Sequence, residues 1–237
     1  MLPLDSDHPL SRGAHLLKEA SRFQDLGLFK DAELLIAEAR KIAAENEQAR
    51  AEIDLFHAIA LIEENRPEEA LQRLTVMLTE YSDWLREGED REIYESVQFQ
   101  RALSLLQLGK NEEARPILEE VASFRFDVDF QSGVHCYLGR CYHELSLYSL
   151  ARTQFELAQA LGVTEDWQAV FHYYYGYTLY ELKNFQRAKR EFILCLQSDP
   201  PGPELFLRYS MLAATCRKLG ERSEAKVYEE KGNLLKR

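Results

Sequence analysis

The chain has 237 residues, of which 46% are hydrophobic and 29% are charged. This composition is typical of a soluble globular protein, and no stretch approaches the ~18 uninterrupted apolar residues of a membrane span. The 40 acidic side chains outnumber the 29 basic ones and give a net charge of -11, which argues against nucleic-acid binding through a positive field. The N-terminus lacks the basic region and apolar run of a secretory signal, so we expect a cytoplasmic protein.

The residue types predict an almost entirely helical protein. Only 11 glycines and 7 prolines occur, and apolar residues recur at spacings of three and four among strong helix formers. The four cysteines form no C-x-x-C pair, so neither a disulfide framework nor a zinc knuckle is indicated and we expect reduced, buried thiols. They are Cys136, Cys141, Cys195 and Cys216. No sequence motif calls for a metal or cofactor.

A small residue followed twelve positions later by alanine recurs six times, and each such pair brackets a turn between two helical patterns. In chain order the pairs are Ala20 and Ala32, Ala58 and Ala70, Ala102 and Ala114, Gly139 and Ala151, Gly176 and Ala188, and Ala213 and Ala225. Successive alanines are 38, 44, 37, 37 and 37 residues apart. This regularity predicts six helical hairpins in one array.

The predicted array covers residues 13–237, with hairpins that start near residues 13, 51, 95, 132, 169 and 206, after an irregular leader over residues 1–12. The additional residues of the 44-residue step fall around Trp84 and Gly88 and predict a longer connection there. The prolines of residues 200–203 end the fifth hairpin. Glu229 and Gly232 replace apolar and alanine positions in the last helix, which predicts a cap.

The fourth and fifth units resemble the tetratricopeptide repeat family. Its pattern, Trp-x2-Leu-Gly-x2-Tyr followed by Ala-x3-Phe, is matched by His135, Leu138, Gly139 and Tyr142 and then by Ala151 and Phe155. The fifth unit repeats it from His172 through Gly176 to Phe192. The resemblance, extended to all six units, implies an all-α, right-handed α-solenoid of six helix-turn-helix hairpins and a non-enzymatic adaptor or scaffold that binds a partner protein.

The resemblance also implies which residues face the concave groove. In the fourth to sixth units these include Arg140, His143, Tyr173, Tyr177, Tyr180 and Arg217. In the second and third units they include an apolar stripe of Leu55, Ile59, Phe99 and Leu103. We expect the tyrosines to be the principal patch for an acidic or carbonyl-rich peptide. Leu17, Ser21, Leu55 and Ile59 stand where the family's carboxylate clamp has lysine and asparagine, so such a clamp is not expected.

Two function classes stay open at this stage. The first is an adaptor that binds a peptide or helix of another protein in the groove, and the second is a structural subunit or homo-oligomer that packs through the apolar stripe. An enzyme is disfavoured, although Cys136 and His143 lie on one helical face where a histidine-activated thiolate is conceivable. His135 and His172 are expected to be packed histidines rather than metal ligands.

Overall fold

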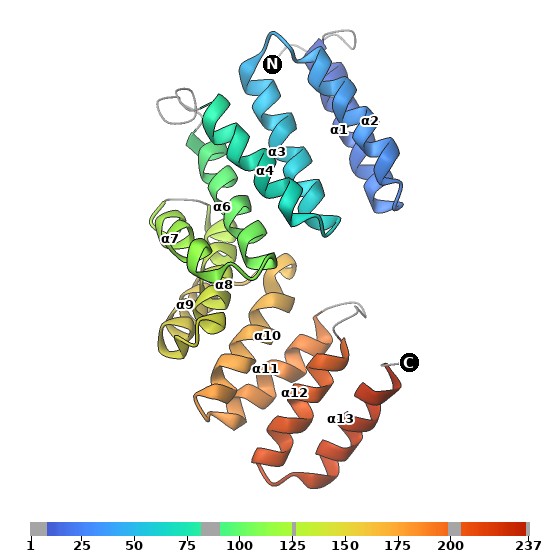
Figure 1. Cartoon of the computed structure of the whole chain (residues 1–237). Coiled ribbons are helices and arrows are strands. Elements are labelled where there is room, and N and C mark those ends of the chain that lie inside the picture. The colour runs from blue at the N-terminus through green and yellow to red at the C-terminus, as the bar shows by residue number, and fades with distance from the viewer. Residues whose placement is uncertain (1–8, 82–90, 125–126, 199–204, 236–237) are drawn as a thin grey trace. The chain divides into compact units, whose positions relative to one another are not determined.

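A computed structural model describes residues 9–81, 91–124, 127–198 and 205–235, which form twelve α-helices and no strand (Figure 1). In chain order they are α1 (Pro9–Asp25), α2 (Phe29–Ile42), α3 (Glu47–Glu63), α4 (Pro67–Glu80), α6 (Arg91–Gln107), α7 (Asn111–Val121), α8 (Val128–Glu144), α9 (Tyr148–Leu161), α10 (Glu165–Glu181), α11 (Phe185–Gln197), α12 (Leu205–Lys218) and α13 (Arg222–Leu234). The all-α class and the six hairpins are confirmed. None of these helices has the length and apolar content that crossing a bilayer requires.

The first helix of each of the first five hairpins is 17 residues long and begins four residues before its predicted start. The extra turn accounts for a repeat longer than the family's. At the N-terminus, α1 begins at Pro9 rather than at residue 13, because proline is well suited to the first position of a helix. The predicted loop around Trp84 and Gly88 and the predicted proline stop at residues 200–203 lie outside the described ranges.

All six hairpins turn in the same way. One residue in each turn has the left-handed conformation, with φ between 58° and 81°, and the residue after it donates a backbone hydrogen bond of 2.8–2.9 Å to a carbonyl five positions earlier. This is the bond of a Schellman motif. The left-handed residues are Gly27, Asn65, Gly109, Ser146, Lys183 and Gly220. The common geometry fixes one register for all six units.

The predicted close approach of the two helices occurs at the small residues. A Cβ atom on Gly139 would lie 2.8 Å from the ring of Phe155, and one on Gly176 would lie 3.1 Å from Phe192. In the first two hairpins the small residue is alanine and its cluster includes an aliphatic residue of the second helix, Ile36 for Ala20 and Leu74 for Ala58. Glycine therefore makes room for a phenyl ring, and alanine for a smaller side chain.

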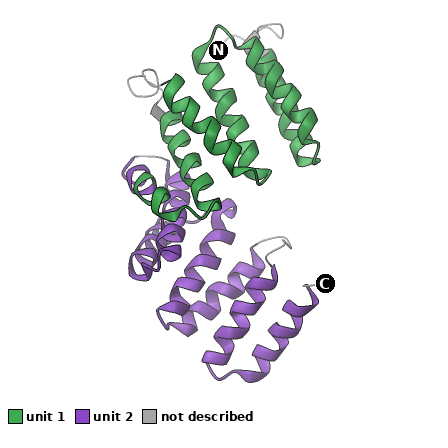
Figure 2. Ribbon diagram, viewed as in Figure 1, with its two compact units in different colours: residues 1–117 green, residues 118–237 purple. Residues whose placement is uncertain are grey.

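The chain divides into two compact units, residues 1–117 and 118–237 (Figure 2). In the first unit the core includes mainly aliphatic clusters around Ala20 and Ile36, around Ala58 and Leu74, and around Leu61 and Ala70. In the second unit aromatic rings form much of the core, where Phe155 lies 5.9 Å from Phe171 between ring centroids.

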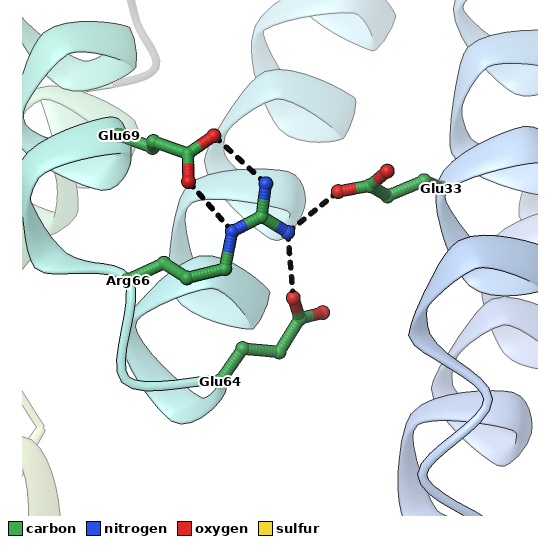
Figure 3. A network of polar contacts seen from close by, with 4 residues as sticks. All are labelled: Glu33, Glu64, Arg66 and Glu69. Atoms are coloured by element: carbon green, nitrogen blue, oxygen red, sulfur yellow. Dashed lines mark hydrogen bonds and ion pairs between the residues drawn. The ribbon is translucent and has the colours of Figure 1, made fainter.

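Charged side chains connect neighbouring hairpins in both units. In the first unit the guanidinium of Arg66 contacts three carboxylates (Figure 3), with a 2.6 Å bond from Nη1 to Glu33 of α2. Glu69 accepts two bonds of 2.7 Å from the same group. In the second unit Lys189 of α11 donates to Glu221 at 2.6 Å. The carboxylates raise the pKa of both cations, so both stay charged.

Candidate partner-binding site

The candidate site lies on α10 and on α8, against which α10 packs. Tyr173, Tyr177 and Tyr180 of α10 follow the four-then-three spacing that places side chains on one helix face. All three are half-buried. We call these three residues the tyrosine face.

The rings of the tyrosine face contact one another and their neighbours edge-on or tilted. The centroid of Tyr177 lies 6.3 Å from that of Tyr173 and 4.6 Å from that of His143 on α8. The ring of Tyr180 lies 5.3 Å from Phe185, the first residue of α11. One side of each ring is therefore packed, and the exposed remainder is held in a fixed orientation.

His143 connects the two helices rather than offering a free donor. Its side chain is buried, and Nδ1 lies 3.0 Å from the hydroxyl oxygen of Thr178 on α10. Burial lowers the pKa of His143 to about 4, so the ring is neutral at physiological pH. The structure brings His143 to the tyrosines, as expected. Its buried ring packs against them instead of lying exposed beside them.

The two predicted arginines differ in their surroundings. Arg140 of α8 is half-buried, and its guanidinium carbon lies 5.2 Å from the ring centroid of Tyr174 and 6.0 Å from that of Tyr137. Arg217 of α12 is exposed and forms an ion pair with Glu229 of α13. Arg217 is therefore neutralised within its own hairpin, which weakens its expected role as a donor beside the tyrosines.

The predicted apolar stripe of the first unit is largely closed by the chain itself. Phe99 is fully buried and Leu103 is 9% exposed. Leu55 and Ile59 are half-buried, and Leu55 packs on the cluster around Leu74. These residues form less of an open surface than the sequence pattern suggests, because α3, α4 and α6 pack against one another.

Sequence reasoning missed several residues around the tyrosine face. Tyr174 lies beside Arg140, and Trp167, at the start of α10, packs its ring 5.8 Å from Tyr137. Glu144 and Glu181 end α8 and α10 and are exposed. The sequence could have indicated both glutamates. Glu144 directly follows the predicted groove residue His143, and Glu181 lies one turn after Tyr177.

The surroundings of Cys136 do not favour the catalytic alternative. Cys136 is buried, and burial raises the pKa of its thiol to about 12. A catalytic cysteine needs a lowered pKa, because the thiolate is the nucleophile. The predicted packed histidines do make side-chain hydrogen bonds, from His135 to Gln154 and from His172 to Glu191, each 2.8 Å long.

Two other polar sites are satisfied within the chain. A cavity of about 650 Å3 in the first unit is lined by α2, α3 and α4, and its buried Asp54 accepts hydrogen bonds from Arg40, Arg73 and Tyr81. In the second unit Cys216, Glu221 and Glu224 lie close enough together to hold a metal ion. Lys189 donates to both glutamates, so its ammonium group already occupies that position.

Comparison with known proteins identifies the fold. No protein-family model matches the chain, and no curated protein matches it in sequence. Among solved structures, the apo quorum sensor NprR from B. thuringiensis superposes with a TM-score of 0.73 at 15% identity, over 99% of this chain and 66% of NprR. PilF of Pseudomonas aeruginosa gives 0.69 at 16% identity, over 93% and 90% of the two chains. Cut9, from the APC/C hetero-tetramer Cut9–Hcn1, gives 0.66 at 16% identity, over 99% and 40%. These similarities confirm a fold of the tetratricopeptide-repeat type.

Proposed function

We propose that the protein is a non-enzymatic adaptor or scaffold that binds a peptide or helix of another protein on the inner face of α8 and α10. The tyrosine face would provide the main contacts, with Arg140 beside it. Tyrosine suits this role because its ring is large, has few rotatable bonds and carries a hydroxyl group for hydrogen bonding.

One observation carries the proposal: three tyrosines in one stripe are half-exposed although their helix packs on both neighbouring hairpins. The corresponding positions of the third hairpin, Phe99 and Leu103, are buried. The solved neighbour Cut9, which is part of a hetero-tetramer with Hcn1, is an example of a similar fold in a protein assembly.

The alternative, a structural subunit or homo-oligomer that packs through the apolar stripe, has less support. Two of the four stripe residues, Phe99 and Leu103, are covered by the chain itself. A monomer over a wide concentration range would favour the adaptor, whereas a dimer that is stable on dilution would favour the alternative.

The proposal is tested by removing two rings of the tyrosine face. A partner is first captured with the purified chain and identified by mass spectrometry, and its affinity is then measured by calorimetry. The double variant Tyr177→Ala/Tyr180→Ala is expected to bind the partner at least ~2 kcal/mol more weakly, which is about 30-fold.

The matched control is Tyr209→Ala/Tyr228→Ala. It removes two half-buried tyrosines that stack on each other between α12 and α13. We expect this control to retain partner affinity. Unchanged affinity in the first variant, or loss of its helical circular dichroism, would contradict the proposal, since the rings would then be dispensable or part of the core.

A further inference from the structure

The charge around the tyrosine face differs from the expectation of an acidic partner. Glu181 lies four residues after Tyr177, on the same face of α10. Glu144 directly follows His143, whose ring is 4.6 Å from that of Tyr177. The negative charge of both carboxylates helps to raise the pKa of Tyr177, after burial. Tyr177 therefore has a carboxylate on its own helix and another on the neighbouring helix.

These two carboxylates make no ion pair within residues 127–198 and 205–235. Glu144 interacts with the hydroxyl of Tyr174, a neutral group. Elsewhere in the same unit, Glu221 and Glu224 are bound by Lys189, and Glu229 is bound by Arg217. Charged side chains in the second unit thus commonly pair with one another, whereas the two beside Tyr177 do not.

Their position on the helices is also unfavourable for stability. Glu144 is the last residue of α8 and Glu181 is the last residue of α10. The C-terminal end of a helix carries a partial negative charge, which repels a carboxylate and favours a cation. Helix stability therefore gives no reason for glutamate at either position.

The two arginines predicted to border the tyrosine face are already engaged. Arg217 pairs with Glu229, and Arg140, one helical turn before Glu144, lies against the rings of Tyr137 and Tyr174. The exposed parts of the half-buried tyrosine rings attract cations through their π-electrons, and the two carboxylates strengthen that attraction. The surface is thus complementary to a positively charged side chain.

We infer that the tyrosine face takes a basic peptide segment, with a lysine or arginine side chain over Tyr177 next to Glu144 and Glu181. This inference rests on the proposed function and specifies the chemistry of its partner. It replaces the acidic peptide expected from the sequence.

The test uses three fluorescein-labelled peptides of about twelve residues that are identical except for a repeated lysine, glutamine or glutamate, with the full chain in fluorescence-polarisation titrations. The lysine peptide is expected to bind at least about tenfold more tightly than the glutamine peptide. The variant Glu144→Gln/Glu181→Gln should lose at least about fivefold of that affinity. Its melting temperature should not fall, because the substitutions relieve repulsion from the helix ends.

The matched control is Glu165→Gln/Asp166→Asn, which removes the same charge from the exposed first turn of α10. We expect it to change the affinity for the lysine peptide by less than about twofold. Equal losses in both variants would overturn the inference, because the attraction would then come from the net charge of the chain. Failure of the lysine peptide to bind, or preference for another peptide, would also overturn it.

The outcome separates this inference from the proposed function. If Tyr177→Ala/Tyr180→Ala weakens binding of the captured partner while Glu144→Gln/Glu181→Gln leaves it unchanged, the adaptor function stands and the basic-segment inference fails. If the tyrosine variant retains full affinity for the captured partner, the proposed function itself fails.

Discussion

The hairpins α3–α4 and α10–α11 have the same backbone register but close their helices with different side chains. In the first, Ala58 clusters with Leu74, and in the second, Gly176 faces Phe192. Compared with α3–α4, the hairpin α10–α11 lacks a methyl group on its first helix and has a larger side chain on its second helix. We infer from this difference that the packing of the two helices depends on the pair of residues rather than on either one alone.

The same two hairpins also differ at a polar pair nineteen residues apart. In α3–α4 it is an ion pair, with Nη1 of Arg73 3.0 Å from Asp54. In α10–α11 it is a hydrogen bond of 2.8 Å between His172 and Glu191. Because the turn geometry is the same, both pairs lie at equivalent positions. The residue types differ, but a polar contact between the two helices is retained.

The residues at the predicted groove positions of the two hairpins also differ. At equivalent positions α3 has Leu55 and Ile59, and α10 has Tyr173 and Tyr177. Both sets are half-buried, and each lies one turn before an exposed glutamate that ends the helix, Glu63 in α3 and Glu181 in α10, yet only the second carries hydroxyl groups. The comparison directs the search for a partner to the second unit.

The largest effect is expected where the comparison involves a buried charge. Asp54→Ala removes a carboxylate that accepts hydrogen bonds from Arg40, Arg73 and Tyr81. We expect a loss of ~3–5 kcal/mol in the free energy of unfolding, because these donors lose their buried acceptor. The matched change Glu191→Ala should cost only ~1 kcal/mol, since it removes one hydrogen bond to His172. Equal losses in urea unfolding would show that the two pairs are equivalent.

A smaller effect is expected where the helices approach most closely. Gly139→Ala places a methyl group 2.8 Å from the ring of Phe155 and should cost ~1–3 kcal/mol. Adding Phe155→Leu recreates the alanine–leucine combination of Ala58 and Leu74, so the double variant should recover part of the loss.

The control for that experiment is Gly13→Ala in α1, where an added Cβ meets no atom within 4 Å. It should stabilise the chain by up to ~1 kcal/mol through helix propensity. Compensation between Gly139 and Phe155 would be refuted if the double variant lost as much free energy of unfolding as the two single variants together.

The smallest effect is expected in the turns. Lys183 has a φ of 62° and Asn65 a φ of 58°, a conformation that asparagine tolerates better than lysine. Lys183→Gly should therefore stabilise the protein by ~0.5–1 kcal/mol, and Asn65→Gly by less. Thermal melting of the two single variants measures the stabilisation at each position. A larger gain in stability at Asn65 than at Lys183 would contradict the prediction.

The hairpins could be predicted because their signals are local. The twelve-residue spacing from small residue to alanine, and breaker or capping residues in the turn between them, recur in every unit. The starts of the first five hairpins were placed four residues late, since the extra first turn lies outside the family's pattern. Pro9 was assigned to an irregular leader although proline is favoured at the first helical position.

The site was less predictable because it depends on contacts between helices. The sequence places Arg217 on the inner face, but its neutralisation by Glu229 depends on how α12 packs on α13. Likewise, the spacing that places Phe99 and Leu103 on one face does not reveal that neighbouring helices bury them. Tertiary packing decides which members of a periodic stripe remain available.

Site-specific photo-crosslinking tests the central claim most directly, because it compares equivalent positions of the two hairpins. Benzoylphenylalanine is placed at Tyr177 in one preparation and at Ile59 in another, and each is irradiated with the captured partner. We predict a covalent adduct with the partner from position 177 and little or none from position 59. An adduct mainly from position 59, or none from position 177, would contradict the assignment of the partner-binding site to the tyrosine face.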